Sequence, residues 1–389
     1  MKKKITILGS TGSIGLTTLN IISKKKNQFI VTLLAAKNNY KEICKQINKY
    51  NPIYFVIANP AIFKKVKKKF KNKKTKILDD YTKIKIKPKS DVTISAIPGT
   101  EGLLPTLSII KSTKKLLLAN KESVICGWEL IKNESFKYKV DIVPIDSEHY
   151  SILQLIKDYK IDQIKKIYLT ASGGPFLNYK PHQFKKIKPK DALKHPKWKM
   201  GKKITIDSST LMNKILELIE AQKLFNIPSK KLDILIHPNS LVHAIVMFNN
   251  GLTKMLYHQT TMIIPIANAI FDEEIDIGDF YKPKIKIKND IENIIFRRVD
   301  AKIFPIIKLK DRVNEHPSTS IIINSTNEVL VDQFLNNNIT YNDIIKGIKH
   351  VLRDRNYKEY AIKKPKTINQ ILDIDIWAKK KILNKLFND

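Results

Sequence analysis

The sequence predicts an α/β protein that opens with a doubly wound parallel sheet, and two patterns in the first third of the chain support this prediction. Short apolar runs of strand length recur there, and stretches with helical spacing, such as 15–24 and 40–49, lie between them. Strands that alternate with helices are typical of parallel sheets with helices on both faces. The predicted strands are ITILG at 5–9, FIVTLLAA at 29–36, YFVIAN at 54–59, VTISAI at 92–97, KLLLAN at 115–120 and VDIVPID at 140–146.

The rest of the chain predicts a second α/β (α+β) region followed by a helical tail. KKIYLTASGGPF at 165–176 has the pattern of a strand that enters a Gly-Gly turn, and residues 232–258 offer strands for a second sheet. We expect a first, Rossmann-like domain at 1–146 and a second domain at 147–275 with a lid at about 192–202. A linker at 276–311 and a helical bundle at 312–389 complete the predicted organisation.

The chain of 389 residues carries a formal net charge of +35, which taken alone suggests an anionic partner such as nucleic acid. The basic residues are lysines spread along the whole chain, apart from Arg297, Arg298, Arg312, Arg353 and Arg355. Proteins that read bases rely on arginine for bidentate contacts, so this composition favours a solvated lysine-rich surface. We expect no nucleic-acid partner, and a nucleotide-sensing regulator that binds nucleic acid stays as one alternative.

Cysteine content and hydropathy bear on the compartment. Cys44 and Cys126 are too few for a disulfide framework, which fits a reducing environment, and neither has the neighbours of a catalytic thiol. The apolar segment of MKKKITILGSTGS stops after Leu8, and no apolar run approaches the ~18 residues of a membrane span. We therefore expect a cytoplasmic protein with no membrane partner.

The first predicted strand runs into a glycine-rich segment, ITILGSTGSIG, which opens a helix. Gly9, Gly12 and Gly15 have the spacing G-x-x-G-x-x-G, a variant of the dinucleotide-binding pattern. Glycines there permit a tight turn, so that backbone amides and the helix N-terminus face a pyrophosphate. An ordinary glycine turn is the alternative interpretation.

The end of the second predicted strand, LLAAKNN, indicates which dinucleotide binds. Enzymes that use NAD place an acidic residue here for the ribose hydroxyls, whereas this chain has Lys37 and Asn38. A cation and an amide suit a 2′-phosphate, which favours NADP. The alternative is that Lys37 is one more surface lysine.

Two carboxylates follow the last strand of the first domain, in the sequence VPIDSEHYS. Asp146 and Glu148 are one residue apart, so in an extended chain both side chains point to one face. Such a pair repels unless a proton or a cation lies between the groups, and hard oxygen ligands suit Mg²⁺ or Mn²⁺. The alternative is the exposed polar end of a strand.

A helix predicted to start near Ser209 adds a third carboxylate. Thr210, Asn213, Lys214 and Glu217 fall on one arc of this helix, opposite an apolar face. With Ser208 at the predicted N-cap, Asn213 and Lys214 form a candidate phosphate site and Glu217 a candidate metal ligand. A solvated face of an amphipathic helix is the alternative.

A further hydroxyl and a candidate lid come from the middle of the chain. Ser172 lies in ASGGP, a turn that lets an anion reach the backbone, and His195 and Trp198 lie in the loop HPKWKMG. An aromatic residue on such a loop is able to cover a ligand and exclude water. We interpret His237 and His243 as core residues or as supports of the site.

Together these motifs resemble the 1-deoxy-D-xylulose 5-phosphate reductoisomerase family from about residue 5 to the end. The resemblance rests on ILGSTGSIG, GLLPTL, LLLANKES, PIDSEH, LTASGGPF, HPKWKMG, DSSTLMNK, LIHPNSLVH and NSTNE. It implies a homodimeric enzyme of the non-mevalonate isoprenoid route, which rearranges its phosphorylated sugar substrate and reduces the resulting aldehyde to 2-C-methyl-D-erythritol 4-phosphate.

The resemblance also implies roles for individual residues. It implies metal ligands for Mg²⁺, Mn²⁺ or Co²⁺ at Asp146, Glu148 and Glu217, which with Lys121 form the catalytic set. It implies contacts with NADPH from Thr11, Gly12, Ser13, Ile14, Ala36, Lys37, Asn38, Asn120, Glu122 and Gly201. It implies contacts with the substrate from Lys121, Ser147, Glu148, Ser172, His195, Trp198, Ser208, Asn213, Lys214 and Glu217, with Met200 beside Trp198 on the lid. We expect a structural or supporting role for His149.

The chain departs from the family pattern at three places. Ala36 and Ile215 stand where the family has glycine, and HQTTMI at 258–263 replaces a segment close to G-x-P-D-M-R. We expect Ala36 to be tolerated at a negative φ and Ile215 to pack on the apolar side of its helix. The catalytic set is intact. The second alternative function, a reductase of the aspartate semialdehyde dehydrogenase type, requires an activated cysteine that this chain lacks.

Overall fold

The computed structural model describes residues 1–84, 86–87, 89–198, 200–282 and 294–387. Two compact units make up the chain. The first comprises Met1–Ser123, Glu129–Tyr150 and Thr261–Lys282, and the second comprises Val124–Trp128, Ser151–Thr260 and Pro283–Asp389. Within the described residues, none of the helices is both long and apolar enough to span a membrane.

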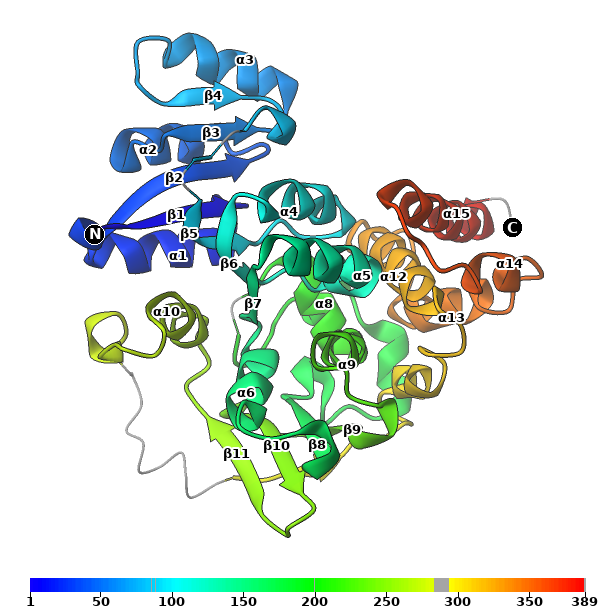
Figure 1. Ribbon diagram of the computed structural model, residues 1–389. Helices are drawn as coiled ribbons and strands as arrows, with labels where there is room; N and C mark the ends of the chain where they lie inside the picture. Colours follow the sequence, from blue (N-terminus) through cyan, green and yellow to red (C-terminus); the bar gives the residue numbers. More distant parts are fainter. Residues whose placement is uncertain (85, 88, 199, 283–293, 388–389) are drawn as a thin grey trace. The chain divides into compact units, whose positions relative to one another are not determined.

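The first unit contains a seven-stranded, fully parallel sheet in the order β4-β3-β2-β1-β5-β6-β7 (Figure 1). The chain starts in the middle of the sheet, runs to one edge, returns to the other side of β1 and runs to the opposite edge. This order is the doubly wound arrangement that the sequence predicts, and the prediction is confirmed. The strands are β1 (Lys3–Leu8), β2 (Phe29–Ala36), β3 (Tyr54–Ile57), β4 (Lys76–Leu78), β5 (Ser90–Ser95), β6 (Thr113–Leu118) and β7 (Asp141–Pro144).

Helices pack on both faces of this sheet, because its strands present apolar side chains on both sides. One apolar core joins β1 and β2 to helices α1, α2, α3 and α10, and a second core on the other face includes Leu8, Leu33 and Ile109. The helices that begin in this unit are α1 (Ser13–Lys24), α2 (Tyr40–Tyr50), α3 (Pro60–Lys69), α4 (Leu103–Ile110), α5 (Lys121–Tyr138), α6 (Ser147–Ile156) and α10 (Ile263–Phe271). Strand β4 was not predicted, since its three residues lie beside a lysine-rich run that masks an apolar signal.

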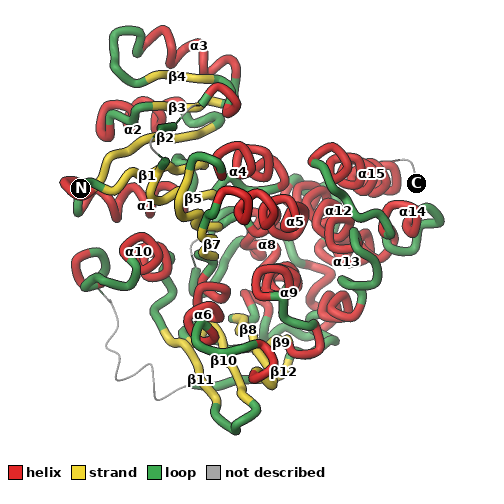
Figure 2. The backbone as a smooth tube through the Cα atoms, viewed as in Figure 1, coloured by secondary structure: helices red, strands yellow, loops and turns green. Residues whose placement is uncertain are grey.

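The second unit combines a mixed five-stranded sheet with most of the remaining helices (Figure 2). Its strands lie in the order β11-β10-β8-β9-β12 and are β8 (Ile164–Ala171), β9 (Leu232–Ile236), β10 (Val242–Phe248), β11 (Thr253–Tyr257) and β12 (Arg297–Arg298). Its helices are α7 (Pro189–Ala192), α8 (Lys202–Thr210), α9 (Met212–Phe225), α12 (Thr319–Leu335), α13 (Tyr341–Val351), α14 (Tyr357–Ala361) and α15 (Ile368–Phe387). The last four form the helical tail that the sequence predicts. The predicted domain boundaries, including a linker that partly falls outside the described residues, stay a prediction.

The glycine loop after β1 gives a first test of the fold. A Cβ atom on Gly15 would lie 2.4 Å from the carbonyl oxygen of Gly9 and 2.6 Å from the Cα of Ser10. We expect Gly15→Ala to lower the free energy of unfolding by about 1–3 kcal/mol, because backbone atoms have to move to admit the methyl group. Denaturant unfolding measures this change.

The matched control is Gly12→Ala in the same loop. A Cβ atom there meets the Gly9 oxygen at 3.4 Å, an ordinary contact. We expect this variant to lose less than about 1 kcal/mol. Equal losses in the two variants would contradict the close approach at Gly15.

Candidate active site

The glycine loop lies at the point where the strand order of the first unit reverses. β1 pairs with β2 on one side and with β5 on the other, and ligands of doubly wound sheets bind at the carboxyl ends of strands at such a point. Gly9 adopts φ +82°, which favours glycine, and α1 begins without a side-chain cap. Thr11, Gly12, Ser13 and Ile14 are exposed or half-buried, so the first amides of α1 are accessible to a pyrophosphate.

Lys37 and Asn38 follow the end of β2, at the same edge of the sheet. The Lys37 ammonium forms an exposed ion pair of 2.8 Å with Glu101, and the Asn38 side chain accepts a hydrogen bond of 2.9 Å from Asn59. Glu101 was missed in the sequence because it lies 64 residues away from Lys37. Exposed ion pairs contribute little, so an anionic group is able to displace Glu101 from Lys37. Ala36 ends β2 without a positive φ, as expected.

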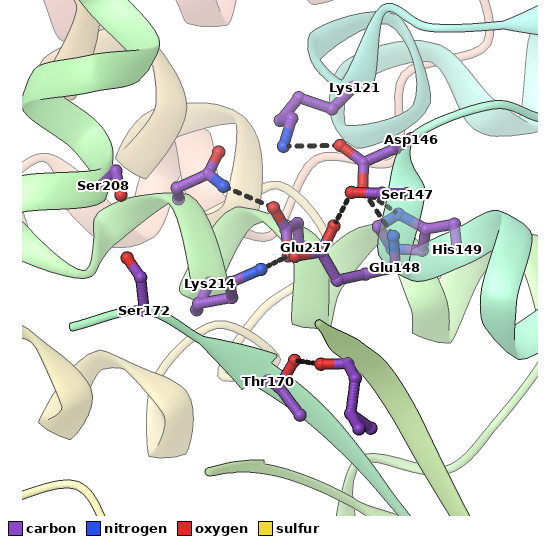
Figure 3. Close-up of polar contacts among 12 residues, drawn as sticks. Lys121, Asp146, Ser147, Glu148, His149, Thr170, Ser172, Ser208, Lys214 and Glu217 are labelled. Atoms are coloured by element: carbon purple, nitrogen blue, oxygen red, sulfur yellow. Dashed lines mark hydrogen bonds and ion pairs between the residues drawn. The ribbon is translucent and has the colours of Figure 1, made fainter. Parts of the chain in front are cut away.

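Asn120 and Lys121 begin α5 beside the carboxyl end of β6. The side-chain oxygen of Asn120 caps the helix by accepting a 2.6 Å hydrogen bond from the Ser123 amide, and its nitrogen donates to the carbonyls of Ile97 and Gly99. The buried Lys121 ammonium lies 3.2 Å from the Asp146 carboxylate (Figure 3). Glu122 is also buried.

Asp146 and Glu148 occupy a strand-to-helix junction, which corrects the extended geometry expected from the sequence. β7 ends at Pro144 and α6 begins at Ser147, so Glu148 already belongs to the first helical turn. Asp146 accepts a 3.3 Å hydrogen bond from the Glu148 amide, and the Ser147 hydroxyl donates to Glu148 at 2.5 Å. A local D-S-E pattern does not distinguish a strand end from a helix start.

His149 supports this group. It is fully buried, and its Nδ1 atom lies 3.3 Å from an Asp146 oxygen. Asp146 therefore has a lysine on one oxygen and an imidazole near the other (Figure 3). This arrangement agrees with the supporting role expected for His149.

In the second unit, the single helix expected near Ser209 is two helices, and the predicted N-cap at Ser208 is wrong. Ser208 lies in the last turn of α8, and Leu211 interrupts the helix with φ +68° before α9 begins at Met212. Thr210 consequently belongs to α8 and does not share the arc of Asn213. The apolar run through Leu211 carried no sign of a break, since leucine rarely adopts a positive φ.

Asn213, Lys214 and Glu217 do share one face of α9, as predicted. Glu217 is buried and accepts hydrogen bonds from the Asn213 amide and from the Lys214 ammonium, the latter at 2.6 Å (Figure 3). Ile215 is fully buried on the apolar side, as expected. Glu217 thus has its charge balanced inside its own helix.

His195, in the segment predicted to be a lid, lies beside two serine hydroxyls. Its Nε2 atom lies 3.1 Å from Ser172 Oγ and 3.1 Å from Ser208 Oγ, and its Nδ1 atom accepts from the amides of Lys197 and Trp198. Nδ1 therefore carries no proton, so the neutral ring has its N–H at Nε2 and directs a donor toward the serines. Ser172 precedes Gly173 and Gly174, which adopt φ +81° and +61° in the predicted turn.

Trp198, further along the segment predicted to be a lid, contacts a pair of stacked histidines. The Trp198 ring lies edge-on to His243 at 6.0 Å, and His243 stacks on His258 at 3.8 Å. Burial, and next the proximity of His243, lower the pKa of His258 to about 3. The divergent segment that begins at His258 therefore adds an aromatic partner to His243, which is itself buried as expected. Met200 and Gly201 complete the lid, and Gly201 occupies the N-cap of α8.

Comparison with known proteins identifies the family to which the chain belongs. A model of 1-deoxy-D-xylulose 5-phosphate reductoisomerase matches residues 5–127, and models of the C-terminal domains of that enzyme match 142–225 and 258–381. The chain is 43% identical to the 1-deoxy-D-xylulose 5-phosphate reductoisomerase of Pelagibacter ubique, over 98% of each chain. The chain belongs to the 1-deoxy-D-xylulose 5-phosphate reductoisomerase family. It is an oxidoreductase.

Other reductoisomerases agree over their full length. The enzyme of Thermodesulfovibrio yellowstonii is 38% identical over 97% of this chain and 98% of its own. A crystal structure of a reductoisomerase in complex with NADPH, fosmidomycin and magnesium covers 99% of this chain and 98% of its own, with TM-score 0.91 and 31% identity. The Zymomonas mobilis enzyme in complex with NADPH covers 100% of both chains, with TM-score 0.89 and 28% identity.

His195 yields a prediction about pH. Burial, and next the charge of Lys214, lower its pKa to about 4 from 6.5. The unfolded chain therefore binds the proton more readily. The stability that the neutral ring contributes is fully present above pH 6.5 and is lost as the pH falls through 4. We expect its imidazole resonances in an NMR titration to titrate near pH 4, with the proton on Nε2 in the neutral form.

The control is His195→Gln, which identifies the resonances by their disappearance. A midpoint near 6.5, or a neutral ring protonated at Nδ1, would contradict the buried geometry and the hydrogen bonds from the lid amides.

Proposed function

We propose that this chain converts 1-deoxy-D-xylulose 5-phosphate to 2-C-methyl-D-erythritol 4-phosphate, using NADPH and a divalent cation, in isoprenoid precursor biosynthesis. Membership of the family over nearly the whole chain supports the activity. The observation that carries it to individual residues is a set of carboxylates. We propose that Asp146 and Glu148 of the first unit act together with Glu217 of the second as the ligands of a metal ion.

These three residues suit a hard divalent cation. All their donor atoms are carboxylate oxygens, which match the preference of Mg²⁺ and Mn²⁺ and not that of softer metals. A lysine accompanies two of the carboxylates, Lys121 at Asp146 and Lys214 at Glu217, and a neighbouring positive charge favours the charged form of a carboxylate. When bound, the cation supplies positive charge for the oxygens of the substrate as negative charge develops on them.

Residues of the chain hold both ends of the substrate, the phosphate and the reacting carbons. The hydroxyls of Ser172 and Ser208, the Nε2–H of His195, the Asn213 amide and the Lys214 ammonium provide donors for the phosphate. Anchoring the non-reacting phosphate fixes the position of the reacting carbons near Lys121, Ser147 and Glu148. Trp198 and Met200 cover the site and exclude water.

The first unit supplies the cofactor site, apart from Gly201. The amides after Gly12 bind the pyrophosphate, and Lys37, released from Glu101, binds the 2′-phosphate that distinguishes NADPH. Asn120 and Glu122 contact the cofactor beside the carboxyl end of β6. The reduced nicotinamide supplies the hydride. We also propose that the enzyme is a cytoplasmic homodimer, following the expectation from the sequence.

The activity is tested with the purified protein, 1-deoxy-D-xylulose 5-phosphate and NADPH, followed by loss of NADPH absorbance. We expect turnover with Mg²⁺ or Mn²⁺, its loss on chelation of the metal, and its recovery on adding the metal back. Absence of turnover with either metal would refute the proposed activity. Retention of full activity with a chelator would refute the role of the carboxylates.

Glu217→Gln tests the metal ligand. We expect kcat to fall at least about 100-fold, because a neutral amide replaces a charged ligand, whereas the dissociation constant of NADPH stays the same. Steady-state kinetics and cofactor titration by fluorescence measure the two effects.

The matched control is Glu129→Gln, which makes the same change at an exposed position of α5 and should leave both values unchanged. Since the substitution also removes the charge that pairs with Lys214, thermal unfolding of each variant is recorded in parallel. Equal losses of activity and of NADPH affinity would contradict this assignment.

A further inference from the structure

Tyr341, the first residue of α13, reaches the helix that carries Ser208. Its hydroxyl donates a 2.7 Å hydrogen bond to the carbonyl oxygen of Ser209 in the last turn of α8, and its side chain is buried. The last carbonyls of a helix lack partners within that helix, and the break at Leu211 prevents α9 from continuing the ladder. The phenol therefore satisfies the backbone directly after Ser208.

The same ring contacts the turn that carries Ser172. Phe176 ends the segment that begins with Ser172, and its ring lies edge-on to Tyr341 at 5.3 Å and 82°. This turn also packs on α8 directly, since a Cβ atom on Gly174 would lie 3.1 Å from the Cα of Ser209. Tyr341 thus touches both segments whose serines meet at His195.

Neighbouring aromatic rings fix the position of the Tyr341 ring. Besides Phe176, the rings of Phe184 and Phe334 lie 5.9 Å and 5.7 Å from it between centroids. Because the ring is held by this packing, the hydrogen bond from its hydroxyl to Ser209 transmits the position of the ring to α8.

We propose that Tyr341 is a positioning residue for phosphate binding, whose hydroxyl holds Ser208 in register with Ser172 and His195. This rests on the proposed function, in which those three groups bind the phosphate of the substrate. Both hydroxyls lie 3.1 Å from His195 Nε2, a geometry that a small shift of α8 would disturb. Tyr341 itself touches no substrate.

The test is Tyr341→Phe, which keeps the ring and removes the hydroxyl. We expect the KM for 1-deoxy-D-xylulose 5-phosphate to rise about five-fold, the factor given by one ordinary hydrogen bond of roughly 1 kcal/mol. The inhibition constant of inorganic phosphate should rise by a similar factor. We expect kcat and the KM for NADPH to stay within about two-fold, a split that general destabilisation would not produce.

Tyr357→Phe is the matched control, because it removes a phenol that is hydrogen-bonded to Thr319 at 2.6 Å and to Glu315 at 3.3 Å instead of to α8. It should leave the KM for the substrate and the phosphate inhibition unchanged. A double-mutant cycle with Ser208→Ala completes the design, since Tyr341→Phe should have little further effect once the Ser208 hydroxyl is gone.

The outcomes separate the two proposals. If Ser208→Ala leaves the KM for the substrate and phosphate inhibition unchanged, the phosphate role of Ser208 fails, and the Tyr341 proposal fails with it. If Ser208→Ala weakens binding and Tyr341→Phe does not, the Tyr341 proposal alone is refuted. An undiminished effect of Tyr341→Phe in the Ser208→Ala background would also refute it.

Discussion

The left-handed backbone at Leu211 is the constraint on which the proposed phosphate-binding half of the site depends. Its φ of +68° costs about 1–2 kcal/mol for a residue with a side chain. The side chain is 1% exposed, and burying a leucine contributes about 1.5–3 kcal/mol, which offsets that cost. The break lets Ser208 end one helix while Asn213, Lys214 and Glu217 begin the next. Without the break, Ser208 and the residues of α9 would lie along one uninterrupted helix.

The tail of the chain stabilises this break. Asn327 of α12 donates a 2.7 Å hydrogen bond to the buried Asp207, and the Lys203 ammonium lies 3.2 Å from the other oxygen of that carboxylate. Tyr341 of α13 bonds the backbone two residues further on. The hydrogen bonds from Asn327 and Tyr341 both end on α8, so the helical tail holds the helix that carries Ser208 of the proposed phosphate site. The motif NSTNE, which contains Asn327, was part of the family resemblance without an assigned role.

The sequence predicts the elements of this fold where one local pattern dominates. The run at 29–36 coincides with β2, and six of the seven parallel strands have an apolar run of their own. β4 was not predicted, because its two apolar residues, Ile77 and Leu78, lie beside lysines and resemble a loop. The helix start at the Asp146 junction and the helix break at Leu211 were not predicted for another reason. Both depend on tertiary contacts that override the local conformational preference of their residues.

Candidate site residues were predictable where they lie close together in the sequence. The residues that contact them from distant parts of the chain were not. Asn213, Lys214 and Glu217 share a face because helical spacing requires it. Glu101 lies 64 positions from Lys37, so no spacing rule connects them. The same holds for Tyr341 and Ser209, which are 132 positions apart.

The ion pair of Lys214 and Glu217 determines how the two proposed ligands relate. The two groups lie 2.6 Å apart, with 8% and 1% of their side chains exposed, so each neutralises the other where water cannot. Breaking such a pair by removing one partner costs about 3–5 kcal/mol, because the remaining charge is buried and uncompensated.

A phosphate that drew Lys214 away would leave the charge of Glu217 without a partner, and a cation that engaged Glu217 would leave the charge of Lys214 without a partner. When both ligands bind, each charge regains a partner of opposite sign. His195 adds no charge to this balance, since its pKa of about 4 leaves the ring neutral near pH 7, where it offers a hydrogen bond alone. The phosphate and the divalent cation are therefore expected to favour each other's binding, through two adjacent side chains on one turn of α9.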